Sequence, residues 1–203
     1  GSVRTGITSM DSSYPLLSRD TFLALARIHA PGILLTYTYG NVLSRIITRV
    51  SNRWRRDKYE YAHAMDNIGG GEVATQNLFY VRKPLEHYLN DHTRVKLWYP
   101  TDADGDARTG ILCMIADELN APWYRRAYDG VGLVGQWLGN TFGVGHKVNM
   151  PGIHYCSERT ARHYWWYLDG LRAQASPADI DRHCTHSDFW RCVGVYDPRA
   201  AHE

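Results

Sequence analysis

Hydrophobic and polar positions along the chain follow two different periods, which predict a mixture of helices and strands. Apolar residues that recur every three to four positions indicate amphipathic helices. The predicted helices span residues 19–29, 42–50, 111–119 and 157–171, and a short one begins at Ser176. Short runs rich in β-branched and aromatic residues, some of them alternating, indicate strands. The predicted strands span residues 33–39, 59–65, 72–75, 93–99 and 189–196.

The order of these elements predicts an α+β fold, in which helices pack on a small antiparallel sheet. The chain has 203 residues, a length that fits one domain and can bury a full core. Residues 1–18 are rich in serine and threonine and are expected to form an N-terminal arm. Residues 19–203 are expected to form the single domain.

Charge and hydropathy exclude some partners and leave others open. The formal net charge is +2, so composition gives no reason to expect nucleic-acid binding. No apolar run reaches the length of a membrane span. Residues 1–20 lack the apolar core of a signal peptide. We therefore expect no membrane span and no classical export signal. The basic cluster 53–58 could still contact a nucleic acid or a membrane, and the predicted helix 42–50 with its basic end could rest on a membrane. A solvated helix end is the favoured interpretation of that cluster.

Cys156 is the candidate nucleophile. It follows the predicted Pro151-Gly152 turn and precedes the predicted helix 157–171. A helix N-terminus carries a partial positive charge and free N–H groups, which favour a thiolate over a thiol and can also serve an oxyanion. The alternative is that Cys156 is a small buried hydrophobe, which is a common role for cysteine.

A thiolate nucleophile needs a histidine base and a group that orients the base. His63 lies on the predicted strand 59–65, and Glu72 lies on the next strand across a glycine-rich turn. Facing strands of a hairpin bring such residues within a few ångströms of each other, so Glu72 is the expected orienting group. Gln76 and Asn77 are the alternatives for this third group.

Other polar clusters give weaker signals. His154 and His163 flank Cys156, and His163 is a competing base two helical turns away. Asp102, Asp104 and Asp106 lack the glycine position and the final glutamate of a calcium loop. His183, Cys184, His186 and Cys192 are close in sequence but lack the usual zinc-ligand spacing. We therefore expect no metal and no cofactor. The pairing of Cys113, Cys184 and Cys192 stays open.

Five segments carry a more specific signal when they are taken in chain order. They are Pro31-Gly32-Ile33-Leu34-Leu35, Ser44-Arg45-Ile46-Ile47 with Tyr61-Ala62-His63-Ala64, Glu72-Val73-Ala74-Thr75, Tyr128-Asp129 with Gly132-Leu133, and Tyr155-Cys156-Ser157-Glu158. Together these segments resemble the motifs G-D-I-L, S-x-x-I…S-H-A, hydrophobic-E-A, Y-D-x-x-G-L and Y-C-S-E-L. Those motifs belong to the circularly permuted NlpC-type, papain-like hydrolases of the YiiX-like group. The chain departs from them at Ile33, where the family has aspartate, and at Arg159, where it has an apolar residue.

The resemblance implies a papain-like core, in which a helix that bears Cys156 packs on a sheet that bears His63. It also implies cleavage or transfer at an amide or ester. Known relatives include cell-wall peptidases, amidases and lipid acyltransferases such as lecithin retinol acyltransferase. The order histidine, acid, cysteine matches the permuted group, because unpermuted papain-like enzymes place the cysteine first.

These expectations combine into one functional hypothesis with two alternatives. The first is a cysteine peptidase or amidase that cleaves peptidoglycan stem peptides, as a phage lytic enzyme or a secreted antibacterial effector. Such an enzyme would reach the periplasm or cell wall by a non-classical route, or otherwise stay in the cytoplasm, and an effector would be paired with delivery machinery or an immunity protein. The second is a thiol acyltransferase or thioesterase that acts on lipid, although membrane contact is not the favoured expectation. The third is a binding module without catalytic activity.

Overall fold

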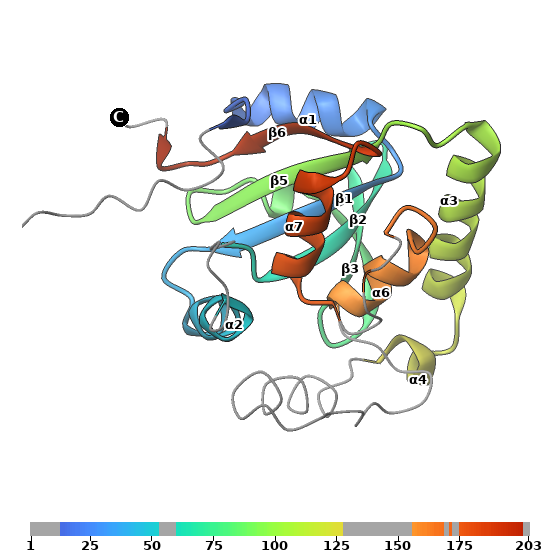
Figure 1. Ribbon diagram of the computed structural model, residues 1–203. Coiled ribbons are helices and arrows are strands. Elements are labelled where there is room, and N and C mark those ends of the chain that lie inside the picture. The colour runs from blue at the N-terminus through green and yellow to red at the C-terminus, as the bar shows by residue number, and fades with distance from the viewer. Residues whose placement is uncertain (1–12, 53–59, 128–155, 169–170, 172–174, 201–203) are drawn as a thin grey trace, which may run out of the picture.

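One six-stranded sheet organises the residues that the computed structural model describes, which are 13–52, 60–127, 156–168, 171 and 175–200 (Figure 1). All neighbouring strands are antiparallel, in the order β4-β3-β2-β1-β5-β6. The strands are β1 (Gly32–Thr38), β2 (His63–Gly69), β3 (Glu72–Gln76), β4 (Tyr80–Pro84), β5 (Thr93–Pro100) and β6 (Trp190–Tyr196). The sheet and its helices confirm the α+β class.

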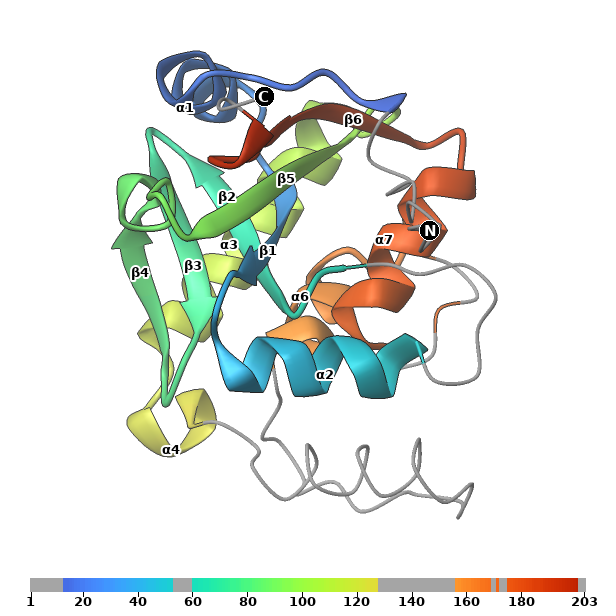
Figure 2. The same cartoon turned by 90° about the vertical axis from the view of Figure 1, so that its left-hand side faces the viewer.

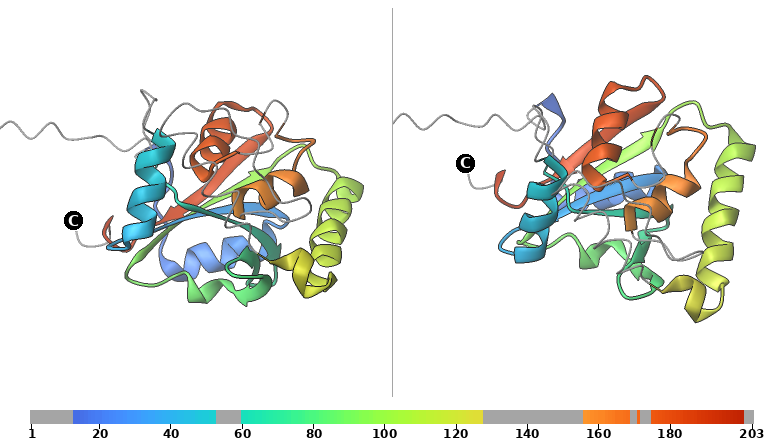
Figure 3. Two further views of the ribbon diagram at one scale, coloured as in Figure 1. Left: turned by 90° about the horizontal axis from the view of Figure 1, so that it is seen from below. Right: turned by 60° about the horizontal axis from the view of Figure 1, so that its bottom comes forward.

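Helices cover both sides of this sheet. They are α1 (Arg19–Ile28), α2 (Val42–Asn52), η2 (Leu85–His87, a 3-10 turn), α3 (Gly105–Asn120), α4 (Trp123–Arg126), α6 (Cys156–His163) and α7 (Pro177–His186). Figure 2 and the left view of Figure 3 show α1 on one side and α6 and α7 on the other. Figure 1 and the left view of Figure 3 show α2 and α3 towards opposite ends.

Two apolar clusters fill the space between the sheet and these helices. The α1 side holds Phe22, Leu34, Met65 and Leu97, all at most 1% exposed. The α6 side is larger and includes Ile33, Leu35, Tyr61, Trp98 and Tyr164. Alternate residues of β1 thus enter opposite clusters, as the two faces of a pleated strand require.

Local sequence explains where several helices begin. The Ser18 side chain accepts a hydrogen bond from the N–H of Thr21 and caps α1. Ser176 and Asp179 form a reciprocal capping box at the start of α7. Asp104 caps α3, which therefore begins at Gly105, six positions before the predicted start at residue 111. Asp104, the middle one of the three aspartates that were compared with a calcium loop, is thus a helix cap.

Both predicted boundaries of one strand are wrong, and its end lies further along the chain because two polar residues are buried. Strand β2 was expected at 59–65, with a turn from residue 66, but it spans His63–Gly69 and fully buries Asp66 and Asn67. The Asn67 side-chain amide donates to the carbonyls of Ala26 (2.8 Å) and His29 (2.7 Å), at the end of α1. These bonds satisfy a group that would otherwise resist burial.

Other parts of the chain also differ from expectation. Residues 80–87, where no strand was expected, form β4 and η2. Helix α6 ends at His163 instead of continuing to 171. Residues 13–18 of the expected arm lie along β6, where Leu17 N–H donates to the Val195 carbonyl at 2.9 Å. Among the helices that the structure describes, none has the length and apolar character to cross a membrane.

Candidate active site

Cys156 is the first residue of α6, and this helix packs against β2. The cysteine is buried, with 8% of its surface exposed. Its place in the first helical turn gives it the N-terminal environment that the sequence predicted. The preceding residues of the turn, including His154 and Tyr155, lie outside the described part of the chain, as do the 128–129 and 132–133 segments.

His63 is the first residue of β2 and contacts Cys156 through its side chain. The other side of the imidazole is fixed, because Nε2 lies 2.9 Å from Oγ1 of Thr75 on β3. This leaves Nδ1 as the ring nitrogen available to the thiol. A hydroxyl that accepts from Nε2–H favours the tautomer in which Nδ1 can take a proton.

The thiol of Cys156 is activated by this arrangement. Burial raises its pKa, but the charge of His63, a hydrogen bond from His63 and the backbone N–H groups of Ala64 and Ser157 outweigh burial. The net result is a pKa below the ordinary value of a cysteine. A thiolate at lower pH is what a cysteine nucleophile requires. The structure therefore brings together two of the three residues expected from the sequence.

Glu72 is not brought to His63, and its expected orienting role is corrected here. Glu72 pairs with Gly69 at the far end of β2, six residues from His63, which is about 20 Å along a strand. Its carboxylate instead lies 3.3 Å from the guanidinium of Arg82, and both side chains are about half exposed. Glu72 therefore lies directly beside the glycine turn, at the opposite end of the strand from His63.

The side chains of the two alternative third groups contact other residues. The Gln76 side chain is buried and donates from Nε2 to the Arg126 carbonyl at 2.8 Å, which holds α4 against β3. Asn77 is exposed, one residue beyond β3. Neither side chain orients His63, and the hydroxyl of Thr75 occupies that place.

Strand register was the signal that could have excluded Glu72 as the orienting group. Met65 pairs with Thr75, so Thr75 lies diagonally opposite His63 on the neighbouring strand. Counting pairs away from the Gly69–Glu72 pair would have placed Glu72 far from His63 and residues 76 to 78 near it. Only the register shift between Asn67 and Gly69 brings Thr75 to its observed position. In addition, the orienting group was expected to be a carboxylate, whereas Thr75 offers a neutral hydroxyl.

Tyr88 contacts the hydroxyl of Thr75 that holds the His63 ring. Its hydroxyl lies 3.4 Å from Thr75 Oγ1, which itself is fully buried. Burial raises the pKa of Tyr88, while hydrogen bonds to Thr75 and Asn77 lower it, with a net upward shift. The base is thus supported by a row of neutral hydroxyl groups rather than by a carboxylate. Such groups orient the ring but add no negative charge beside an imidazolium.

No family model and no curated protein matches this chain. The candidate site is therefore identified from the contacts of its own residues.

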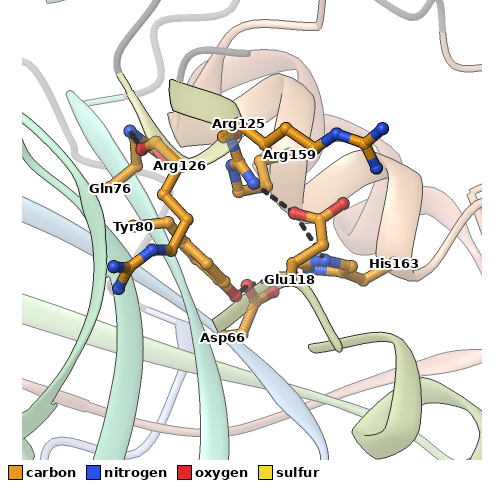
Figure 4. Close-up of polar contacts among 8 residues, drawn as sticks. All are labelled: Asp66, Gln76, Tyr80, Glu118, Arg125, Arg126, Arg159 and His163. Atoms are coloured by element: carbon orange, nitrogen blue, oxygen red, sulfur yellow. Dashed lines mark hydrogen bonds and ion pairs between the residues drawn. The ribbon is translucent and has the colours of Figure 1, made fainter. Parts of the chain in front are cut away.

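A buried ionic network anchors the helix that bears Cys156 (Figure 4). His163, at the end of α6, places Nδ1 3.0 Å from Oδ2 of Asp66 on β2. The Tyr80 hydroxyl donates to the same carboxylate oxygen at 2.5 Å. His163 and Asp66 are at most 2% exposed. His163 is therefore part of the support of α6 and does not compete with His63 for the thiol.

Helix α3 contributes the second carboxylate of the network. Glu118 pairs with Arg159 of α6, and its Oε2 lies 3.4 Å from Nε2 of His163. Arg159 also donates to the Arg125 carbonyl at 3.0 Å and lies 4.8 Å from the centre of the Tyr80 ring. The arginine that departs from the apolar residue of the family motif thus joins α6 to α3 and α4.

Charges in the network compensate each other across α6. Burial would lower the pKa of His163, but Asp66 and Glu118 outweigh it and raise the pKa to about 9. Burial would raise the pKa of Glu118, but His163 and Arg159 lower it to about 2. At neutral pH, His163 and Glu118 are therefore both charged. This explains how a helix of sequence CSERTARH can be almost fully buried.

The remaining cysteines and histidines form no metal site among the described residues, where no three His, Cys, Asp or Glu side chains are grouped to hold an ion. Cys113, Cys156, Cys184 and Cys192 are all free thiols. Burial raises the pKa of Cys184 well above its ordinary value, with a smaller contribution from Asp181. Cys184 is therefore an unreactive thiol, in contrast to Cys156.

Proposed function

We propose that the protein is a cysteine hydrolase in which Cys156 is the nucleophile and His63 is the base. The observation that supports this proposal is the contact between His63 and the thiol at the start of α6, together with the lowered pKa of that thiol. Cys184, which is at least as buried, has a raised pKa, mainly because of burial and with a further contribution from Asp181. Burial alone therefore does not account for the state of Cys156.

The proposed reaction begins with transfer of the thiol proton to Nδ1 of His63. The thiolate attacks a carbonyl carbon, and free N–H groups of the first turn of α6 are the available donors for the developing oxyanion. His63 then protonates the leaving amine or alcohol, and water hydrolyses the thioester. Thr75 holds the ring throughout by accepting from Nε2–H.

Peptidoglycan is the proposed substrate, at an amide bond of the stem peptide. Support for this choice comes from the resemblance of the five sequence motifs to NlpC-type hydrolases. The enzyme would act as a lytic enzyme or antibacterial effector in the periplasm or cell wall. The alternative is an acyl ester of a lipid, and one observation favours it: apolar residues on α2 face outward, beside the end of the sheet that carries His63.

The rate of Cys156 alkylation by iodoacetamide across pH tests the dyad without a substrate. In the parent protein we expect rapid alkylation well below pH ~8.5, the value for a free cysteine. The His63→Ala variant should lose this low-pH reactivity, while His183→Ala, a partly exposed histidine on α7, should keep it. Mass spectrometry should assign the label to Cys156. Equal pH profiles for the parent and His63→Ala would refute the dyad.

Purified murein sacculi test the substrate. We expect the parent to release soluble fragments with new amino groups, and Cys156→Ala to release none. Release of fatty acid from lipid vesicles, with intact sacculi, would support the lipid alternative. Equal release of murein fragments by Cys156→Ala would refute the hydrolase proposal.

A further inference from the structure

Helix α2 presents apolar side chains outward. Val42 is 61% exposed, Leu43 57% and Ile46 44%. The residues that turn inward are more polar, since Ser44 and Thr48 are half-buried beside Ile47. A surface helix of a soluble domain normally has the opposite arrangement. The outward apolar face, defined here as Val42, Leu43 and Ile46, therefore needs a partner.

Positive charge borders this apolar face. Arg45 and Arg49 are both exposed and lie one turn apart on α2. No acidic residue lies within α2, and the sequence continues directly into the basic residues 53–58. Across residues 41–58 there are six basic residues and one acidic residue, Asp57. The whole chain carries a formal net charge of only +2, so this segment concentrates the positive charge.

The position of α2 relates this face to the candidate active site. Thr36 of β1 pairs with His63 of β2. Helix α2 lies in the connection between these two strands, starting four residues after β1 ends. It is therefore attached to the end of the sheet at which the base lies, and it packs against α7 (Figure 2).

We propose that the outward face of α2 is a docking site for an anionic lipid surface. An apolar strip bordered by arginines matches the interface of a bilayer, in which acyl chains lie beneath negatively charged head groups. A protein partner would have to offer both an apolar groove and an acidic rim, whereas an anionic bilayer offers both by composition. This site is separate from the proposed chemistry of Cys156.

Sedimentation with vesicles tests the proposal, using phosphatidylcholine alone and phosphatidylcholine mixed with phosphatidylglycerol. We expect the parent to bind the anionic vesicles and to bind the neutral ones much more weakly. The Arg45→Gln/Arg49→Gln variant should bind about 30-fold more weakly at low salt, since each arginine near the surface contributes about fivefold. The Val42→Ser/Leu43→Ser/Ile46→Ser variant should lose on the order of 100-fold.

Matched variants on α1 control for general changes in charge and hydropathy. Arg19→Gln/Arg27→Gln and Ile28→Ser alter exposed residues on the opposite side of the sheet, and Ile28 is 72% exposed. Both should bind like the parent. A repeat in Cys156→Ala should also match the parent, which separates docking from catalysis.

Four results would overturn the proposal. The first is no vesicle binding by the parent. The second is equal binding to neutral and anionic vesicles. The third is a concentration-dependent dimer of the parent that is lost in the α2 serine variant, because a second copy would then cover the face. The fourth is a lower unfolding temperature of that variant than of the parent, because the chain itself would then cover the face.

Discussion

The His163–Asp66 pair makes a quantitative prediction about stability at alkaline pH. His163 has a pKa of about 9 in the folded protein, against 6.5 for an unperturbed histidine. The protonated form therefore stabilises the fold. That contribution is fully present below pH 6.5 and is lost as the pH rises through about 9. At about 1.4 kcal/mol for each pH unit, the difference corresponds to about 3 kcal/mol.

Chemical denaturation at a series of pH values from 6 to 9.5 measures this contribution. The free energy of unfolding of the parent should fall by about 3 kcal/mol across the window. The Cys156→Ala background is used throughout, because the lowered pKa of the thiol would add an opposite slope. His163→Gln should be less stable than the parent at pH 6 and should lose most of the slope. His186→Gln, at an exposed position of α7, should keep it.

A flat stability profile in the parent would refute the assigned charge on His163. The same slope in His163→Gln would show that another group titrates in this window. Asp66→Asn distinguishes these explanations, because it removes the main carboxylate partner and should also flatten the profile. Since α6 carries Cys156, the loss of low-pH alkylation in a folded His163→Gln variant that retains Cys156 would further show that the network positions the nucleophile.

Three further perturbations test separate contacts. Thr75→Val keeps the shape but removes the hydroxyl on Nε2 of His63, so the pH profile of Cys156 alkylation should shift upward while the unfolding temperature changes little; an unchanged profile would exclude the orienting role. Asp181→Asn leaves the buried ammonium of Lys96, 2.9 Å away, without its carboxylate and should cost about 3–5 kcal/mol in denaturation experiments. Gly32→Ala would place a methyl group 2.7 Å from the Trp98 carbonyl oxygen and should cost on the order of 1–3 kcal/mol, with parent-like stability contradicting the tight β1–β5 approach.

Periodicity predicted the main elements because their buried residues are apolar. Strand β5 alternates Val95, Leu97 and Tyr99, and it lies where the pattern placed it, although Arg94 and Lys96 between them are buried as well. Periodicity failed at Asp66 and Asn67, which look like turn residues in sequence. Their burial depends on partners about 100 and 40 residues away, respectively, and no local pattern encodes such pairs.

The candidate site shows the same division. Cys156 and His63 could be identified because their residue types suggest chemistry and their surroundings predict a helix start and a strand. The orienting group could not be identified by type, because a carboxylate was expected and a hydroxyl is present. Its position depends on the register of β2 and β3, which shifts between Asn67 and Gly69. An irregularity of this kind is invisible in hydropathy.

The order of the strands has a consequence for synthesis on the ribosome. Strands β1 to β5 and the pairings among these five strands all lie between residues 32 and 100, so His63 and Thr75 can be assembled early. Cys156 and β6 emerge much later, because α3 and a further stretch of chain come first. Domains fold as their segments become available during translation. We therefore expect the nascent chain to hold His63 and Thr75 in place before Cys156 is available, so that the proposed catalytic dyad is complete only after α6 docks.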